Sequence, residues 1–293
     1  MPVKFMMIKN TASANLCKRF GLCLSLFLLL LFFFHLSGNA QSSSKSKIRP
    51  NWNEVLEEQL FPGKKIQDSS FNFKGIFDEI FILTADSIKL HGLLFKAASS
   101  KGLIFYLHGS NGALDTWGKI ANIYTDNGYD LFMLDYRGYG KSEGKVTSEE
   151  TLYSDLQTVY DQLTQHYPED HMILIGQSIG TALASTIASY NNPKMLILQA
   201  PYYNFKDWTH HVAPELDTTG IPYHFNNAAA LQKVKCQTII FHGDEDNAVY
   251  FGSSVKLSKF FKKHDKLIRL RHEGHNDFSK NKDYLRAINE LLR

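Results

Sequence analysis

The stretch His171-Met-Ile-Leu-Ile-Gly-Gln-Ser-Ile-Gly180 determines how the rest of the chain is interpreted. Residues 171–175 are apolar and partly β-branched, as in a strand buried on both faces of a parallel sheet. A Gly-x-Ser-x-Gly turn follows directly, and a helical pattern rich in small residues begins behind it. Gly176 and Gly180 are needed because a Cβ at either position would collide with the neighbouring strand or helix. The stretch therefore predicts a nucleophile elbow that exposes Ser178 above the sheet.

A second copy of the pattern, Gly140-Lys-Ser-Glu-Gly144, occurs upstream. The strand predicted before it, at 129–134, ends several residues too early, and the next helix begins only near Ser148. Ser142 therefore lies in a polar glycine loop and not at a bend between strand and helix. We expect Ser178, not Ser142, to be the nucleophile.

Residues 1–40 have the pattern of a secretory signal peptide. Four basic residues and no acidic residue precede an apolar run from Gly21 to Leu36, and small residues lead to Ala40. We expect cleavage after Ala40 and export of the protein, to the periplasm or the medium. The apolar run approaches the lower limit for a membrane span, so an uncleaved anchor at 21–36, with membrane association, is the alternative.

Charge and cysteine content limit the possible partners. Removal of the four basic residues of 1–40 changes the formal net charge from +3 to −1, so the folded part carries no basic excess that would indicate nucleic-acid binding. Cys17 and Cys23 fall within the predicted signal peptide. Cys236 is then left alone, and we expect no internal disulfide.

The remainder of the chain is long enough for one sizeable α/β domain. Residues 41–75 are predicted to be a polar linker followed by a short helix that Asn51 caps and that runs through Leu60. The domain at 76–293 begins with an antiparallel hairpin at 80–83 and 88–95. Further strands are predicted at 103–107, 129–134, 171–175, 194–199, 238–241 and 267–270. Helices are predicted near 115–125, at 148–166, after the elbow, around 251–263 and from Asp277.

Strict alternation of strands and helices predicts a mostly parallel central sheet with helices on both faces. The aromatic, irregular stretch at about 201–227 interrupts this alternation and is predicted to form a short cap over the elbow. We expect most of its aromatic residues to pack the cap onto the body. A cap this short should leave a small, apolar and fairly open pocket.

A serine nucleophile needs a base, a carboxylate that orients the base, and donors for the oxyanion. After the strand at 267–270 the chain reads Arg271-His272-Glu273-Gly274-His275. His275 is the expected base, because it follows a flexible Gly in the loop beyond the strand. His272 is the competitor, expected to be a packed or surface residue.

Three carboxylates follow the strand at 238–241, namely Asp244, Glu245 and Asp246. Any of them could orient His275, and spacing alone does not choose. The chain order Ser, acid, His is the one associated with hydrolases of this topology.

Two backbone amides are the expected oxyanion donors. The Ile179 amide lies at the start of the helix behind the elbow, and the Ser110 amide lies in the loop His108-Gly-Ser-Asn-Gly112 after a buried strand. An ordinary glycine turn is the alternative for that loop.

Together these segments resemble the α/β-hydrolase family over residues 76–293. The resemblance rests on the two loops beginning at His108 and Asp135, the elbow, His242-Gly-Asp-Glu-Asp246 and Gly274-His-Asn-Asp-Phe278. It is greatest to the serine hydrolases grouped with the Bem46 and ABHD13/ABHD17-like proteins. The resemblance implies that Asp246 is the acid and His275 the base, and that Asp135-Tyr-Arg-Gly is structural. The chain differs in having Val249-Tyr250 where relatives commonly have Val-Pro.

The sequence thus predicts an exported serine hydrolase that cleaves carboxylic esters of small molecules through an acyl-enzyme. A peptidase or amidase, or a lipid thioesterase, would use the same residues, and a non-catalytic binding protein is the remaining alternative. No metal-ligand spacing and no phosphate-binding or dinucleotide-binding loop occurs in the sequence, so we expect no cofactor, no metal and no nucleic-acid partner.

Overall fold

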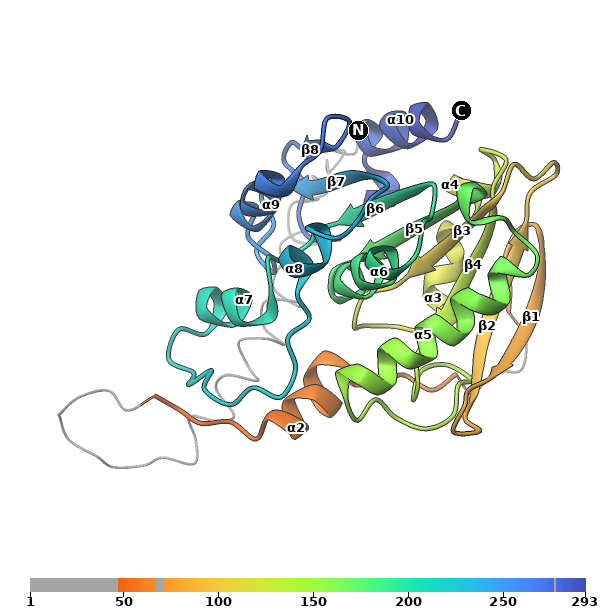
Figure 1. Cartoon of the computed structure of the whole chain (residues 1–293). Helices are drawn as coiled ribbons and strands as arrows, with labels where there is room; N and C mark the ends of the chain where they lie inside the picture. Colours follow the sequence, from red (N-terminus) through yellow and green to blue (C-terminus); the bar gives the residue numbers. More distant parts are fainter. Residues whose placement is uncertain (1–46, 67–70, 277) are drawn as a thin grey trace, which may run out of the picture. The chain divides into compact units, whose positions relative to one another are not determined.

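The computed structural model describes residues 47–66, 71–276 and 278–293. The predicted signal peptide lies outside these residues. Within them, eight strands form one sheet in the order β1-β2-β4-β3-β5-β6-β7-β8 (Figure 1). The strands are β1 (Ile76–Leu83), β2 (Lys89–Lys96), β3 (Leu103–Leu107), β4 (Asp130–Asp135), β5 (Met172–Gln177), β6 (Met195–Gln199), β7 (Gln237–Gly243) and β8 (Lys266–Leu270).

The first two strands form the predicted antiparallel hairpin, and β2 also pairs antiparallel with β4. Every other pairing in the sheet is parallel. The predicted mostly parallel sheet is therefore confirmed. Because parallel strands place their carboxyl ends at one edge, the loops after β3, β5, β7 and β8 are brought together there.

Helices cover both faces of the sheet (Figure 1). The longer ones are α5 (Glu149–Thr164), α6 (Ile179–Tyr190), α7 (Phe205–Val212) and α10 (Lys282–Leu291). The shorter ones are α2 (Trp52–Glu54), α3 (Leu114–Trp117), α4 (Asn122–Thr125), α8 (Asn227–Leu231) and α9 (Gly252–Leu257), with single turns η1 (Val55–Leu60), η2 (Gly118–Ile120), η3 (Glu169–His171), η4 (Ser258–Phe260) and η5 (Phe278–Lys280).

Alternate residues of the strands enter two separate cores. In β3, Phe105 packs into a core with α5, α6 and α8, whereas Tyr106 packs into a core with α3, α4 and α10. This period of two is what a strand buried on both faces requires.

Three predicted helices differ from the structure. The helix expected near 115–125 is broken into α3, η2 and α4 at Gly118, where a Cβ would lie 2.6 Å from the Phe73 ring. The helix expected over 251–263 ends at Phe260, and a turn follows in which the Lys262 amide donates to Asp265. The last helix begins at Lys282 and not at Asp277, because the Asn281 side chain caps it by accepting from two amides. Asp277 itself lies outside the described residues.

The short helix at the start of the described part is confirmed. Asn51 caps α2 by accepting from the Asn53 amide, and α2 continues into η1, which ends at Leu60. None of the helices formed by the described residues is long and apolar enough to cross a membrane.

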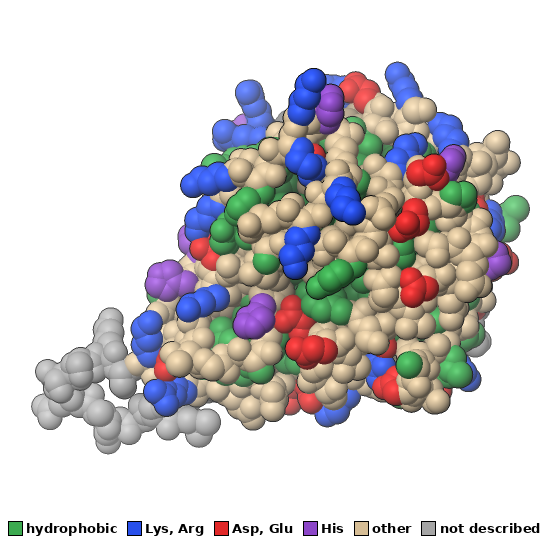
Figure 2. Space-filling model, viewed as in Figure 1, with side chains coloured by type: hydrophobic (Ala, Val, Ile, Leu, Met, Phe, Trp, Pro, Cys, Tyr) green, Lys and Arg blue, Asp and Glu red, His purple; other side chains and the backbone are tan. Residues whose placement is uncertain are grey.

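Basic side chains gather over the part of the molecule that carries α9 and β8 (Figure 2). Residues 233–293 contain 13 Lys and Arg against 8 Asp and Glu. Lys266 and Arg269 of β8 are exposed, and β8 is an edge strand of the sheet. Charged side chains at this position disfavour pairing of the edge with another chain.

Candidate active site

The turn between β5 and α6 forces Ser178 into a strained conformation. Its φ is +53° and its ψ is −119°, in a region that side chains other than Gly rarely occupy. A Cβ on Gly176 would lie 2.3 Å from the Gly180 carbonyl oxygen, and one on Gly180 would lie 2.1 Å from that of Leu107. The two glycines therefore let strand, helix and β3 approach closely enough to form the predicted sharp bend.

The structure brings Ser178, His275 and Asp246 together. His275 Nε2 lies 2.9 Å from Ser178 Oγ, and His275 Nδ1 lies 2.7 Å from Asp246 Oδ2. A carboxylate only accepts, so Nδ1 carries the proton of a neutral imidazole and Nε2 is free to accept from the hydroxyl. This is the arrangement in which a His can act as a general base toward a Ser.

Close backbone packing aligns the two loops that carry His275 and Asp246. A Cβ on Gly243, at the end of β7, would lie 2.3 Å from the Glu273 carbonyl oxygen and 2.5 Å from that of Gly274. The Glu245 amide also donates to the Glu273 carbonyl at 3.0 Å. The loop after β7 thus lies directly against the loop after β8.

Hydrogen bonds keep the buried carboxylate of Asp246 ionised. Burial alone would raise the pKa of Asp246, but hydrogen bonds from His242 and His275 outweigh burial and hold that pKa well below its ordinary value. The amides of Ala248 and Val249 both donate to Oδ1 at 2.8 Å. Asp246 can therefore keep a negative charge next to His275.

The two other acids of this loop have different partners. Asp244 accepts from the Arg269 side chain and from the His272 amide, and Glu245 lies 3.0 Å from His272 Nδ1. The His272 side chain is 84% exposed, so of the two predicted positions, packed or at the surface, it takes the surface one. The structure thus places Asp246 against His275 and pairs the other two acids with surface residues.

The two segments that carry the expected oxyanion donors lie beside Ser178. A Cβ on Gly109 would lie 3.6 Å from Ser178 Cβ, so the loop after β3 passes next to the nucleophile. Ile179 is the first residue of α6, where a helix offers amides that have no partner inside the helix. Within the described residues, the Ser110 amide donates to no backbone carbonyl.

Ser142, in the second Gly-x-Ser-x-Gly copy, is fully buried and has a structural role. Its hydroxyl donates to the Asp135 carbonyl at 2.6 Å and accepts from the His91 amide at 2.8 Å. The hydroxyl joins the end of β4 to β2.

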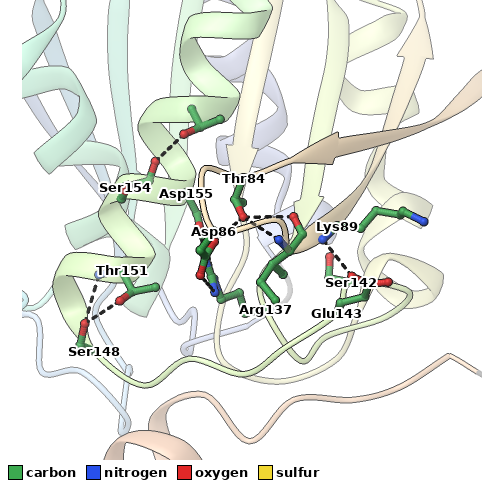
Figure 3. A network of polar contacts seen from close by, with 12 residues as sticks. Thr84, Asp86, Lys89, Arg137, Ser142, Glu143, Ser148, Thr151, Ser154 and Asp155 are labelled. Atoms are coloured by element: carbon green, nitrogen blue, oxygen red, sulfur yellow. Dashed lines mark hydrogen bonds and ion pairs between the residues drawn. The ribbon is translucent and has the colours of Figure 1, made fainter.

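Arg137 also fixes the glycine loop that follows β4 and contains Ser142 (Figure 3). Its guanidinium donates to Asp86 in the hairpin turn and to Asp155 in α5, with distances of 2.5 to 2.7 Å. Asp135 accepts from the Leu114 amide at 3.1 Å. Arg137 therefore holds the glycine loop in place, whereas the Asp135 side chain joins the end of β4 to α3.

Sequence reasoning missed the role of His242, the first residue of the His-Gly pair after β7. His242 is fully buried, and its Nε2 lies 3.3 Å from Asp246 Oδ2. The sequence did contain a signal for this contact, because His242 lies inside an apolar strand, four residues before the acid.

The chain is similar to known proteins in sequence and in fold. A family model described as serine aminopeptidase, S33, matches residues 98–220. Alpha/beta hydrolase domain-containing protein aho-3 of Caenorhabditis elegans is 30% identical over 166 residues, which cover 56% of this chain and 48% of that protein. Alpha/beta hydrolase domain-containing protein 17B of Xenopus laevis is 28% identical over 201 residues, which cover 66% and 67%. The chain therefore matches about half of the first relative's length and about two thirds of the second's.

Solved esterase structures share the fold. An esterase of Pyrococcus furiosus superposes with a TM-score of 0.64 at 16% identity, covering 80% of this chain and 97% of that one. Est1E of Butyrivibrio proteoclasticus, solved with ferulic acid bound, superposes with a TM-score of 0.57 at 19% identity, covering 73% and 96%. Strand order, elbow and these similarities together show that the chain has the α/β-hydrolase fold and is similar to the alpha/beta hydrolase domain-containing protein 17 relatives.

Proposed function

We propose that the chain is a serine hydrolase that cleaves carboxylic esters through an acyl-enzyme intermediate. The observation that carries the proposal is the continuous hydrogen-bonded line from Ser178 Oγ to His275 and on to Asp246, at 2.9 and 2.7 Å. The strained backbone of Ser178 supports it, because backbone strain is often found at functional sites.

In the first half of the reaction, His275 Nε2 takes the hydroxyl proton as Ser178 Oγ attacks the ester carbonyl carbon. The carbonyl oxygen becomes an oxyanion, and the amides of Ser110 and Ile179 stabilise its charge. The ester C–O bond then breaks, and the alcohol leaves with the proton that His275 returns. Asp246 stabilises the imidazolium in between.

In the second half, a water molecule replaces the alcohol. His275 takes a proton from the water, which attacks the acyl carbon, and the same amides stabilise the second oxyanion. Collapse breaks the bond to Ser178 Oγ, releases the carboxylic acid and returns the proton to the serine.

Peptide or amide cleavage is the second candidate, and the description of the matching family model favours it. An aminopeptidase also needs a carboxylate that can bind the amino terminus of its substrate. Asp244 and Glu245, next to the site, are instead paired with Arg269 and His272. Several of the structural neighbours are esterases, which supports ester cleavage.

A matched substrate panel tests the choice. Purified protein is given an ester, a thioester and an amide of the same acyl group, with Ser178→Ala as the blank. The proposal predicts the highest kcat/KM for the ester. A preference for the thioester would assign a thioesterase, turnover of the amide alone would assign a peptidase, and equal rates with Ser178→Ala would refute serine catalysis.

We further propose export, because residues 1–40 have the charge and apolar pattern of a signal peptide. Intact mass of protein recovered outside the cytoplasm should show a chain that begins at Gln41. A membrane-bound species that keeps residues 21–36 would instead support the anchor, with membrane association.

A further inference from the structure

The loop that carries the Ser110 amide has an unusual set of side-chain contacts. Three successive carbonyl oxygens of this loop each accept a hydrogen bond from a side chain. Tyr136 Oη donates to the His108 carbonyl at 2.8 Å, His108 Nδ1 donates to the Gly109 carbonyl at 2.7 Å, and Tyr139 Oη donates to the Ser110 carbonyl at 2.7 Å. The direction of every peptide plane from 108 to 111 is therefore fixed.

The middle contact concerns the oxyanion hole directly. The Gly109 carbonyl and the Ser110 N–H belong to the same peptide group. A trans peptide is planar, with its C=O and N–H pointing in opposite directions, so a bond that holds the carbonyl also sets the direction of the N–H. We propose that His108, Tyr136 and Tyr139 are positioning residues that aim this N–H at the oxyanion.

Burial keeps the three donors in the required protonation state. All three side chains are fully buried, and the imidazole lies 4.2 Å from the Tyr136 ring and 5.4 Å from the Tyr139 ring, between ring centroids. Burial lowers the pKa of His108 and raises that of both phenols well above their ordinary value. His108 is therefore neutral with its proton on Nδ1, and both hydroxyls remain donors.

Topology explains why the two loops meet. The tyrosines follow β4, and the oxyanion loop follows β3, its parallel neighbour in the sheet. Arg137, between the tyrosines, ties their loop to α5 and to the hairpin turn (Figure 3). The glycine-rich loop with its buried Ser142 thus becomes a rigid support for the oxyanion hole. Packing of the aromatic rings in the core would not by itself require the hydrogen bonds that the tyrosine hydroxyls donate.

The inference rests on the proposed serine hydrolase, and conservative variants test it. Tyr136→Phe, Tyr139→Phe and the double variant keep the rings and remove the hydroxyls. Tyr160→Phe is the matched control, since Tyr160 is an equally buried tyrosine whose hydroxyl donates to Glu169 in another part of the fold. The measurements are kcat, KM, Tm and the affinity of a trifluoromethyl ketone, which forms an oxyanion on Ser178.

Complete loss of one oxyanion donor lowers kcat by about 10² to 10³. We expect a misaimed donor to cost less, about tenfold for each single variant and more for the double variant. Ketone affinity should fall by the same factor as kcat, while KM stays within about twofold. Tyr160→Phe should lower Tm as much as the other variants do and leave kcat unchanged.

His108 gives an independent comparison between two variants that both lose the imidazole. The Asn amide in His108→Asn can donate where Nδ1 did, whereas His108→Leu cannot. We expect the two variants to lose a similar amount of Tm. We expect kcat to be about tenfold higher for the Asn variant than for the Leu variant, because the Leu variant only misaims an oxyanion donor and does not remove it.

Two results would overturn the inference: a double Tyr variant with wild-type kcat, or a loss of kcat that the ketone affinity does not share. Ser178→Ala, assayed in parallel, separates the two proposals. If Ser178→Ala is inactive and the Tyr variants are fully active, the inference alone fails. If Ser178→Ala retains activity, the serine hydrolase itself is wrong.

Discussion

His242 Nε2 lies 3.3 Å from Asp246 Oδ2, the same carboxylate oxygen that lies 2.7 Å from His275 Nδ1. The same Nε2 lies 2.9 Å from the Val249 carbonyl oxygen, and Nδ1 lies 2.6 Å from Ser254 Oγ. Since a carbonyl only accepts, Nε2 carries a proton that it shares between the carbonyl and the carboxylate. His242, buried near the end of β7, therefore holds Asp246 and its loop in place.

Replacement of His242 should affect both stability and rate. His242→Leu leaves the buried Val249 carbonyl and one side of Asp246 without a donor, which should lower the free energy of unfolding by about 1–3 kcal/mol. The pKa of Asp246 should rise, because one of the hydrogen bonds that lower it is lost. We expect kcat to fall with little change in KM, and urea unfolding with steady-state kinetics checks both. An unchanged kcat would show that Asp246 needs no such support.

The choice among the acids is tested by two matched amide variants. Asp246→Asn removes the charge partner of His275 and should lower kcat by about two to four orders of magnitude, as loss of the orienting carboxylate does in serine proteases. Asp244→Asn disturbs a contact with Arg269 and should cost less than about tenfold. Equal losses in the two variants would leave the acid unassigned.

Stability against pH gives a second readout for Asp246. Its pKa in the folded protein is lowered from an ordinary value of 3.8. A lowered pKa stabilises the fold above the unfolded value and loses that contribution as pH falls toward the folded value. The stability advantage of the wild type over Asp246→Asn should therefore be complete near neutral pH and shrink below about pH 4. If the difference in unfolding free energy between the wild type and Asp246→Asn did not depend on pH, the lowered pKa of Asp246 would be contradicted.

The segment 201–227 is docked onto the loop that carries Asp246. Trp208 of α7 donates from Nε1 to the Ala248 carbonyl at 2.8 Å, and Tyr250 donates to Asp207 at 2.8 Å while its ring stacks on His211 at 4.0 Å between centroids. Tyr250 therefore docks α7 onto this loop through both its hydroxyl and its ring.

Tyr250→Ala should therefore loosen α7. We expect faster amide hydrogen exchange in α7 with no change in α5, because local opening follows the loss of local contacts. Tyr250→Phe keeps the stacked ring and should show a smaller effect, a loss of about 1 kcal/mol for one hydrogen bond. Exchange that rises equally in α5 would indicate global destabilisation instead.

The expected acyl-chain preference depends on the size of the cap predicted at 201–227. Most aromatic residues of 201–227 are buried in the body as expected, and the one helix of this segment, α7, has 8 residues. So short a cap favours a small, open pocket, in which each fitting methylene adds roughly 0.8 kcal/mol. We predict that kcat/KM on simple esters peaks at about two to eight acyl carbons. A steady increase to long fatty-acyl chains would show a lipase-like or thioesterase-like pocket.

Much of this architecture follows from local sequence pattern. Buried strands are runs of apolar residues with glycines or polar turns at their ends, so the sheet and the elbow at Ser178 could be predicted. Helix interruptions could not, because the interruption at Gly118 lies against Phe73, which is far away in sequence. The start of the last helix was misplaced because Asn281 and Asp277 are both good N-caps in the sequence, and in the structure Asn281 caps the helix.

The site was predictable to a different degree for each residue. Ser178 could be predicted from the Gly-x-Ser-x-Gly motif, and His275 could be predicted from its place in the loop after a strand. Asp244 and Asp246 are equivalent in spacing, and the family resemblance was needed to prefer Asp246. The contacts of His242 and of Tyr139 join loops that only the folded sheet brings together, so no local pattern contains them.

Labelling by a fluorophosphonate tests the central claim most directly, because the reagent reacts with an activated serine. Wild-type protein, Ser178→Ala and Ser142→Ala are treated in parallel, and the labelled peptide is identified by mass spectrometry. We predict one label on Ser178, no labelling of Ser178→Ala, and a loss of ester turnover on the order of 10⁶, as in a protease that lacks its nucleophile. Full labelling of Ser178→Ala, or a label on Ser142, would contradict the account.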